Sequence, residues 1–335
     1  MRVLITGGAG FIGSHLVDHH LERGDEVVVV DDFSTGSRHN LRDRGGRQVV
    51  LVEGRVEDPR VLDDAFLRID LVYHLAAAVG VFEILRRPLD ALRTNLDATE
   101  AIFERATREG VRTIFTSTSE VYGKNGEASL SEKSDSIYGP TTASRWLYAV
   151  SKATDEFLAL AHHREHGFPV TIARLFNTTG PRQSGAYGMV VPRFVHQAMN
   201  GEPLTVFGSG QQTRCFTHVA DVVDCLTGLA ACDASIGEVV NIGRPAEISI
   251  NDLAEMVVSI TGSSSEIVHV PYDLAYEPGF EDMRRRVPDV TRLDELLGRV
   301  PETPLEVTIR DIIDWIAADQ DGRRSIAALA AAGEG

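Results

Sequence analysis

The stretch Arg2-Val-Leu-Ile-Thr6, followed by Gly7-Gly-Ala-Gly10-Phe-Ile-Gly13, decides the fold of this 335-residue chain. Its first five residues are an apolar run typical of a buried strand, and the glycines follow with GxxGxxG spacing. A helical pattern of apolar residues then continues through Leu16, Val17 and Leu21. Glycines at this spacing permit a tight turn, bring the backbone close to a pyrophosphate and let the helix pack on the strand. The segment therefore predicts a dinucleotide-binding turn.

An acidic pair follows the next predicted strand. Glu26-Val-Val-Val-Val30 is a continuous apolar run, as in a parallel strand buried on both faces, and it leads into Asp31 and Asp32. A carboxylate about 20 residues beyond the glycines suits the ribose diol of NAD and repels the 2′-phosphate of NADP. We therefore expect NAD as the cofactor, with Asp31 as the first choice for the ribose contact.

Strands and helices alternate along the first half of the chain, which predicts an α/β fold with a Rossmann-type doubly wound parallel sheet over residues 1–177. The predicted strands are 2–6, 26–30, 48–52, 70–75, 111–117 and 168–174, and the predicted helices are 12–23, 59–67, 91–109 and 144–166. Beyond residue 178 the alternation gives way to short helices at 190–200, 219–231, 250–261 and 304–318. We interpret 178–318 as mainly a smaller C-terminal substrate-binding lobe, with the chain crossing back at least once, and 319–335 as a tail.

Composition narrows the class of protein. The net charge of −16 argues against nucleic-acid binding, and no apolar run is long enough for a membrane span. The N-terminus enters a strand at once, so we expect no signal peptide. The three cysteines, Cys215, Cys225 and Cys232, are too few and too scattered for a disulfide framework or a zinc site. We therefore expect a cytoplasmic protein whose anionic ligand is met by arginines placed near it.

Tyr148-Ala-Val-Ser-Lys152 is a candidate catalytic pair. Residues four apart share one face of a helix, so the phenol and the ammonium are expected to meet. Only three residues of the chain are lysines, and one of them stands here. A nearby ammonium favours the phenolate and lowers the pKa of tyrosine. The spacing predicts a general base that takes a proton from an alcohol.

A third element follows the predicted strand at 111–117, where Thr118-Ser119-Glu120-Val-Tyr-Gly123 begins. The carboxyl ends of parallel strands deliver side chains to the ligand crevice. Thr118 can hydrogen-bond a sugar hydroxyl or its ketone, and Ser119 and Glu120 can move a proton at a neighbouring carbon. A solvent-exposed capped turn remains the alternative for Glu120. An enzyme that acts only at one alcohol carbon needs the Tyr and the Thr but no extra acid.

These motifs together resemble the extended short-chain dehydrogenase/reductase family that acts on nucleotide sugars. Further matching stretches run from Arg174 to Arg182, from Gln212 to Asp221 and from Arg284 to Asp289, so the resemblance covers residues 1–318. Within that family, Thr-Ser-Glu and the stretch from Arg145 to Lys152 are most similar to UDP-glucuronate decarboxylases. The 4,6-dehydratases usually carry Thr-Asp-Glu, and many 4-epimerases lack the Glu.

The resemblance implies roles for individual residues. It gives catalytic roles to Thr118, Ser119, Glu120, Tyr148, Lys152 and Arg286. It implies NAD contacts at Gly7, Gly10, Phe11, Ile12, Gly13, Asp31, Asp32, Asp58, Leu75, Ala76, Ala77, Asn95, Tyr148 and Lys152. It implies nucleotide-sugar contacts at Asn177, Arg182, Val190, Arg193, Arg214 and Arg286. One departure concerns the loop before the 190–200 helix, where xylose synthases often carry an arginine and this chain has Gly188-Met-Val-Val-Pro192; Arg193 or Arg182 would compensate.

By this resemblance the sequence predicts NAD-dependent decarboxylation of UDP-glucuronate through a 4-keto intermediate, giving UDP-xylose, the UDP-4-keto-pentose or both. A UDP-sugar 4-epimerase, acting on UDP-glucose or UDP-glucuronate, is the main alternative. A 4,6-dehydratase and a non-catalytic NAD-binding regulator rank below it. We expect a homodimer.

We expect structural rather than catalytic or metal-binding roles for the histidines near residue 162 and for His74. His162, Glu165 and His166 spell H-x-x-E-H, a zinc-peptidase pattern, but no further ligand is evident and we expect no metal site. His74 ends a buried strand, where we expect it to satisfy a backbone group rather than to act as a base.

Overall fold

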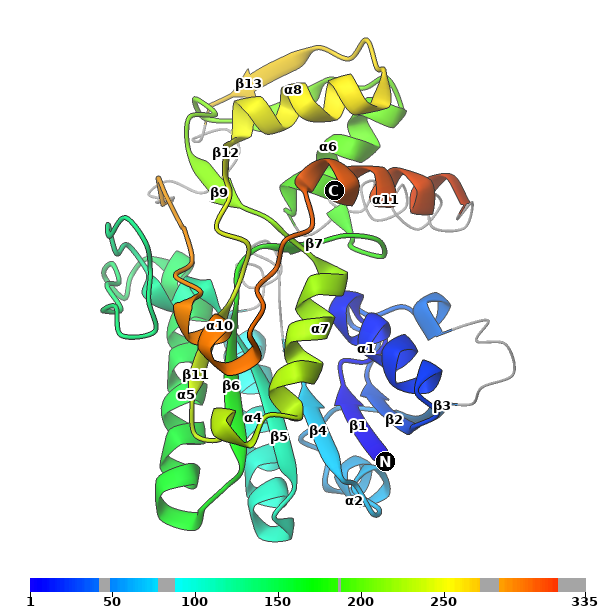
Figure 1. Cartoon of the computed structure of the whole chain (residues 1–335), viewed down its shortest axis with the longest axis vertical. Coiled ribbons are helices and arrows are strands. Elements are labelled where there is room, and N and C mark those ends of the chain that lie inside the picture. Colours follow the sequence, from blue (N-terminus) through cyan, green and yellow to red (C-terminus); the bar gives the residue numbers. More distant parts are fainter. Residues whose placement is uncertain (42–48, 78–87, 186–187, 272–282, 319–335) are drawn as a thin grey trace.

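A computed structural model of the chain describes residues 1–41, 49–77, 88–185, 188–271 and 283–318. At its centre, the described residues form a seven-stranded parallel sheet with the strand order β11-β6-β5-β4-β1-β2-β3 (Figure 1). The strands are β1 (Arg2–Thr6), β2 (Glu26–Asp31), β3 (Val49–Glu53), β4 (Leu71–His74), β5 (Arg112–Thr118), β6 (Val170–Leu175) and β11 (Val239–Ile242). The order reverses between β1 and β4, which is where an open parallel sheet forms its ligand crevice. The predicted Rossmann-type α/β fold is confirmed.

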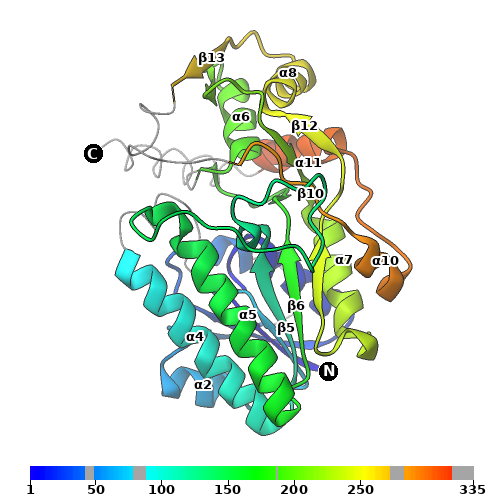
Figure 2. The same cartoon turned by 90° about the vertical axis from the view of Figure 1, so that its left-hand side faces the viewer.

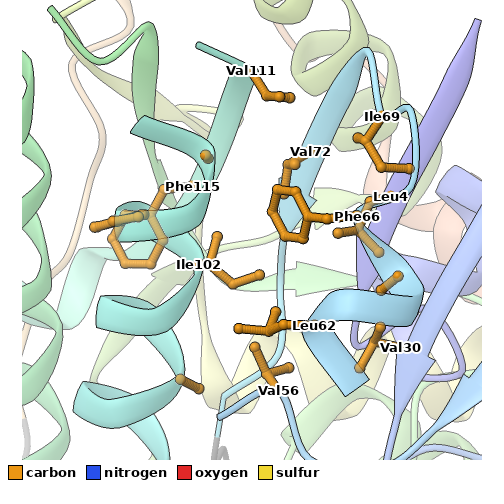
Figure 3. Close-up of a cluster of buried hydrophobic side chains, with 14 of the residues drawn as sticks. Leu4, Val30, Val56, Leu62, Phe66, Ile69, Val72, Ile102, Val111 and Phe115 are labelled. Carbon is orange, nitrogen blue, oxygen red and sulfur yellow. The ribbon is translucent and has the colours of Figure 1, made fainter. Parts of the chain in front are cut away.

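One face of the sheet is covered by α2 (Pro59–Ala65), α4 (Pro88–Glu109) and α5 (Leu147–His166). Figure 3 shows the apolar cluster between these helices and the strands, in which Phe66 and Ile102 meet Val72 and Phe115. These side chains are almost completely buried, and burying a side chain of this size contributes roughly 1.5–3 kcal/mol. The predicted helix at 144–166 is in fact α5 preceded by a short 3₁₀ turn, η3 (Ser144–Trp146).

The opposite face is covered by α1 (Phe11–Glu22), α7 (Val219–Ala230) and α10 (Thr291–Leu297). The sequence assigned the helix at 219–231 to the second lobe, whereas α7 packs on the sheet, where Val222 and Leu226 join its core. The chain then continues through η5 (Asp233–Ser235) into β11, so it crosses back to the edge of the sheet.

A smaller lobe lies beyond the carboxyl ends of the strands (Figures 1 and 2). Its elements are α6 (Val190–Met199), β8 (Leu204–Phe207), β9 (Thr213–Cys215), β12 (Glu247–Ser249), α8 (Ile250–Thr261), β13 (Ile267–Val270) and α11 (Leu305–Ala318). They enclose a separate apolar core around Phe194, Leu253 and Ile309. The short strands β7 (Thr178–Thr179) and β10 (Thr217–His218) pair where the chain passes between the lobe and the sheet.

Two short 3₁₀ turns complete the described elements: η1 (Arg38–Leu41) after β2, and η2 (Ser119–Tyr122) directly after β5. Among the described helices, none combines the length and the apolar character that crossing a bilayer requires. The predicted tail at 319–335 lies outside the described residues.

Candidate active site

The glycine-rich turn between β1 and α1 fits a dinucleotide pyrophosphate. Gly7 has a φ of +70°, a left-handed conformation that favours glycine. A Cβ at Gly13 would lie 2.2 Å from the Gly7 carbonyl oxygen, so only a glycine lets α1 approach the turn this closely. Gly10 begins α1 without a side-chain cap, which leaves the first backbone N–H groups of the helix to bind a phosphate.

Asp31, at the end of β2, lies beside this turn. Its carboxylate accepts hydrogen bonds of 2.9 Å from the backbone N–H groups of Ala9 and Phe33. Burial raises the pKa of this carboxyl, and the two backbone bonds oppose that rise. A Cβ at Gly36 would lie 2.8 Å from Asp31 Oδ1, so the glycine leaves room next to the carboxylate, as a ribose diol requires.

Some of the other predicted cofactor residues lie near the glycine-rich turn or near the helix with Tyr148 and Lys152, whereas Asp32 is exposed. Ala76 follows β4 and lies against the turn, because a Cβ on Gly7 would be 3.0 Å from its backbone nitrogen. Asn95 is buried in α4, where its Nδ2 lies 3.3 Å from Ser151 Oγ on the helix that carries the catalytic pair. Asp32 is exposed and accepts a hydrogen bond from the Ser34 N–H.

Three further candidates lie at strand and helix ends. Leu75 and Ala77 flank Ala76 after β4, and the Leu75 N–H donates to Thr6 Oγ1 at 3.2 Å. Asp58 caps α2, accepting a hydrogen bond of 2.9 Å from the Arg60 N–H. The capping bond accounts for Asp58 without a ligand, so its contact with the adenine remains a prediction.

Tyr148 and Lys152 lie one turn apart near the start of α5, as their spacing predicts. Lys152 is 2% exposed. Burial lowers the pKa of its ammonium, while the carboxylates of Asp155 and Glu156 raise it. The lysine is therefore a desolvated cation that depends on nearby anions for its charge.

The predicted pKa shift of the tyrosine is wrong in direction. Desolvation raises the pKa of the Tyr148 phenol, and the negative charges of Glu120 and Asp155 raise it further. The Lys152 ammonium lies 3.8 Å from Asp155 Oδ2 and 4.3 Å from the centre of the Phe115 ring. The spacing of Tyr148 and Lys152 reveals neither the burial of the phenol nor the two nearby carboxylates, and all of these raise its pKa.

A buried cluster of charges stands where β5 ends. Thr118 caps η2, and its Oγ1 accepts a hydrogen bond of 3.2 Å from the Glu120 N–H. Glu120 Oε1 lies 2.5 Å from Arg286 Nη1, and Glu120 Oε2 lies 2.6 Å from Arg145 Nη2. Arg286 Nη1 also donates to Ser119 Oγ at 3.4 Å. The structure thus brings Ser119, Glu120 and Arg286 together, although Arg286 lies far along the chain.

The electrostatics of this cluster fix its protonation state. Burial opposes ionisation of Glu120, but Arg286 and Arg145 outweigh it and hold the pKa of the carboxyl at about 2. Burial lowers the pKa of Arg286, and Glu120 offsets part of that shift. One carboxylate faces two guanidinium groups, so the cluster carries one net positive charge and suits an additional anion.

Arg145 is the residue of this cluster that sequence reasoning missed as a site residue. It lies in η3, three residues before Tyr148, and its side chain is 9% exposed. The only signal was its place within the stretch that runs to Lys152. An arginine at that position looks like any helix-end cation until the fold brings Glu120 beside it.

Four of the six predicted substrate residues line one pocket, while Arg286 lies in the Glu120 cluster. The four that line the pocket are Asn177, Val190, Arg193 and Arg214. The Arg193 guanidinium lies 4.2 Å from the centre of the Phe207 ring, which also lines the pocket. Sequence reasoning missed Phe207, because an aromatic residue at the end of an apolar strand looks like ordinary core. A pocket with aromatic, amide and arginine groups suits a nucleoside diphosphate.

Arg182 is not among the residues that line this pocket. Its Nη1 lies 2.6 Å from Asp18 Oδ2 and 3.3 Å from Ser14 Oγ, both on α1. It therefore ties the loop after β7 to the cofactor helix. Of the two arginines expected to compensate, Arg193 lines the pocket, and it stands inside α6 rather than in the loop before it.

The histidine pattern at 162–166 makes ordinary contacts. His162 Nδ1 lies 3.1 Å from the Thr107 hydroxyl, and His163 Nδ1 donates to the Phe168 carbonyl at 2.8 Å. Within the described ranges, no group of three or more His, Cys, Asp or Glu side chains is arranged to hold a metal.

The fold and the site define a class of protein. The molecule combines a dinucleotide turn, a Tyr and a Lys one helical turn apart on a doubly wound sheet, and a pocket lined by aromatic, amide and arginine side chains. Together they define a short-chain dehydrogenase/reductase-type enzyme. The model of the NAD dependent epimerase/dehydratase family matches residues 3–243, so the chain belongs to that family. Its cofactor is NAD.

The relatives that the chain resembles are mostly decarboxylases by name. It is 41% identical over 316 residues to a UDP-N-acetyl-alpha-D-glucosaminuronate decarboxylase from Bacillus cytotoxicus, which covers 94% of this chain and 97% of that protein. It is 38% identical over 309 residues to UDP-glucuronic acid decarboxylase 5 from Arabidopsis thaliana, covering 91% and 86%. Among solved structures, UDP-glucose 4-epimerase from Thermotoga maritima with UDP-glucose has a TM-score of 0.85 and 32% identity, covering 95% of this chain and 99% of that one.

Proposed function

We propose that this protein decarboxylates a UDP-hexuronate, either UDP-glucuronate or its 2-acetamido counterpart, through a 4-keto intermediate. The names of the two relatives support both sugars. The observation that carries the proposal is the placement of Glu120 between Arg145 and Arg286. A reaction confined to C4 has no use for a permanently ionised acid held by two arginines, whereas a reaction that also involves C5 and its carboxylate does.

The first step takes place at C4 of the sugar. NAD, when bound, supplies the oxidant for this carbon. Tyr148 Oη removes the proton of the 4-hydroxyl, and Thr118 Oγ1 hydrogen-bonds the same oxygen. Lys152 supports the phenolate from the neighbouring helical turn. The raised pKa of the phenol means that the base depends on local cations to work near neutral pH.

The second step uses the cluster at the end of β5. A ketone at C4 is beta to the C6 carboxylate, so loss of CO2 leaves an enolate whose negative charge lies on the C4 oxygen. Thr118 and Tyr148 hydrogen-bond that oxygen. Arg286 and Arg145 orient the departing carboxylate. Because Glu120 stays ionised, the proton that returns to C5 comes from a water molecule that Ser119 and Glu120 position. Reduction of the ketone then gives the pentose, and release before reduction gives the 4-keto sugar.

A UDP-sugar 4-epimerase is the second candidate. The observation that favours it is the structural similarity to UDP-glucose 4-epimerase over 95% of the chain. An epimerase would use Tyr148, Lys152 and Thr118 in the same way and return the C4 hydrogen to the other face. A 4,6-dehydratase fits less well, because Ser119 stands where those enzymes usually carry Asp. A non-catalytic NAD-binding role leaves the complete set of Tyr, Lys and Thr without a purpose.

Product mass separates these functions. The wild-type protein is incubated with NAD and either UDP-glucuronate or its 2-acetamido counterpart, and the nucleotide sugars are weighed by mass spectrometry. We expect loss of CO2 from one or both. A product of unchanged mass that co-elutes with the galacto epimer contradicts the proposal in favour of epimerisation. Loss of water would instead indicate a dehydratase.

We also propose that the protein is a cytoplasmic homodimer. Two large apolar side chains are exposed on the outer face of α5, with Phe157 71% exposed and Val150 43% exposed. The helix lies beside α4 on one side of the molecule (Figure 2). Pairing of this face with a second copy would bury both side chains. Sedimentation of the wild type against Phe157→Glu tests the dimer, and a monomeric wild type would overturn it.

A further inference from the structure

Asp155 is a buried carboxylate on α5 that the proposed chemistry does not use. It has no exposed surface, and no described group lies in good hydrogen-bond geometry to either of its oxygens, although the Thr99 hydroxyl and the Lys152 ammonium are near enough to lower its pKa. Its nearest described cation is the Lys152 ammonium at 3.8 Å. A buried charge without hydrogen bonds is costly, so a carboxylate at this position needs an explanation beyond packing.

Three buried polar side chains, Thr6, His74 and Thr99, form a hydrogen-bonded series that leads from β1 toward Asp155. Thr6 Oγ1 accepts hydrogen bonds from the Leu75 and Ala76 N–H groups, so its own proton goes to His74 Nδ1 at 2.7 Å. His74 is neutral, because burial and Lys152 lower its pKa to about 3. Its proton therefore resides on Nε2, which donates to Thr99 Oγ1 at 3.2 Å.

The orientation of Thr99 follows from this chain. Since its oxygen accepts from His74, its own hydroxyl proton is available to Asp155. Both His74 and Thr99 are buried. The expectation that His74 satisfies a backbone group is wrong, because its two nitrogens bind two threonine hydroxyls. The chain thus ends with a donor at one side of Asp155 and the Lys152 ammonium at the other.

We propose that Asp155 is a positioning residue for the Tyr148–Lys152 pair: its buried carboxylate holds the Lys152 ammonium on the inner side of α5 and keeps it charged. The role does not require contact with substrate. It places the cation one helical turn from the phenol that needs it, and it compensates a charge that burial would otherwise remove.

Charged groups on every neighbouring element act on this pair. On α5, Lys152 faces both Asp155 and Glu156, and Glu156 is itself held by the Arg174 guanidinium at 2.6 Å. From β4 comes neutral His74, from α4 the Thr99 hydroxyl, and from η2 the Glu120 carboxylate, which acts on Tyr148. Burial raises the pKa of Asp155 to about 6, although Lys152 and Thr99 lower it in part. Glu156 is committed to Arg174, so Asp155 is the main counter-charge of Lys152.

Lysine NMR tests the proposal without any turnover. The chain has only three lysines, Lys124, Lys133 and Lys152, so ¹³Cε labelling gives three signals, and the signal lost in Lys152→Arg assigns the third. The pKa of Lys152 is measured in the wild type, in Asp155→Asn and in the control Glu165→Gln, which removes an exposed charge from the same helix. We expect Asp155→Asn to lower the pKa of Lys152 by about one unit or more, and the control to leave it unchanged.

An unchanged Lys152 pKa in Asp155→Asn would overturn the proposal. If Asp155→Asn does not fold, the wild type and Lys152→Met are compared by carboxyl ¹³C NMR instead. The pKa of Asp155 should then rise when the ammonium is removed, and a constant value would equally contradict the pairing.

A second measurement rests on the proposed function. Asp155 raises the pKa of both Tyr148 and Lys152, so its removal should move the whole pH profile of kcat/KM toward lower pH. A purely structural residue would lower kcat/KM equally at every pH. If the protein turns over no UDP-hexuronate, the proposed function fails, whereas the NMR result still decides the role of Asp155.

Discussion

Two carboxylates act on Tyr148, and their surroundings differ: Glu120 is half-buried between two arginines, whereas Asp155 is fully buried beside one lysine. Glu120 is held by two arginines at 2.5 and 2.6 Å, and its pKa falls to about 2. Asp155 has one lysine at 3.8 Å, and its pKa rises to about 6. Burial raises the pKa of both acids, so the difference lies in their partners. An acid clamped by arginines stays charged at every working pH and can position an anion, whereas an acid beside one desolvated lysine can respond to proton movement.

The largest effect on the reaction rate is expected at Tyr148, the proposed general base. Tyr148→Phe removes the general base, so oxidation at C4 should fall by about 10²–10⁴-fold, while the Glu120 cluster stays intact. Reduced-nicotinamide absorbance after mixing with substrate measures this step. Tyr138→Phe is the matched control, because the Tyr138 hydroxyl donates to the Val121 carbonyl at 2.8 Å and has no part in the proposed chemistry. A Tyr148→Phe protein that keeps more than about a tenth of the rate would exclude Tyr148 as the base.

The cluster of Glu120, Arg145 and Arg286 should make the larger contribution to the free energy of unfolding. Glu120→Gln leaves Arg145 and Arg286 buried without their anion, and removing one partner of a buried pair costs about 3–5 kcal/mol. Arg145→Met should cost less, because Glu120 keeps Arg286. Urea unfolding measures both. The exposed pair Arg285–Glu247 provides the control: Arg285→Met should cost less than about 1 kcal/mol. Equal losses for Glu120→Gln and Arg285→Met would show that the cluster is not an energetic unit.

The two acids should also give stability slopes of opposite sign. The folded pKa of Asp155 lies above its unfolded value of 3.8, so its contribution is present below pH 3.8 and is lost as pH rises through about 6. Relative to Asp155→Asn, the wild type should lose up to about 1.4 kcal/mol per pH unit across that window. The folded pKa of Glu120 lies below its unfolded value of 4.5, so its contribution is present above pH 4.5 and is lost as pH falls through about 2. Slopes of the same sign for both variants would contradict the comparison.

Local sequence patterns predicted the parts of the site that lie close together in the chain. The GxxGxxG turn, Asp31 after the second strand, and Thr118 to Glu120 after the fifth were found because strand ends in a parallel sheet share one edge. Tyr148 and Lys152 were found because helical spacing fixes their shared face.

Long-range encounters were not predictable in the same way. Arg145 in η3 approaches Glu120 in η2 only in the folded chain, and no sequence spacing encodes that contact. Asp155 looks like a solvent-facing helical acid until α4 covers it. The Arg182 side chain pairs with Asp18 on α1 and does not line the substrate pocket. The predicted direction of the Tyr148 pKa shift was wrong because burial of the phenol raises its pKa, and the Glu120 and Asp155 carboxylates, which lie outside the motif, raise it further.

The most direct test asks whether Glu120 acts in the loss of CO2 and not in oxidation at C4. The variant Glu120→Gln is mixed with NAD and a UDP-hexuronate labelled at C6. Reduced-nicotinamide absorbance reports oxidation at C4, and labelled CO2 reports the later step in the same sample. We expect oxidation at a rate close to that of the wild type, followed by slow CO2 release and a build-up of reduced cofactor. Equal loss of both signals, or full retention of both, would contradict this expectation.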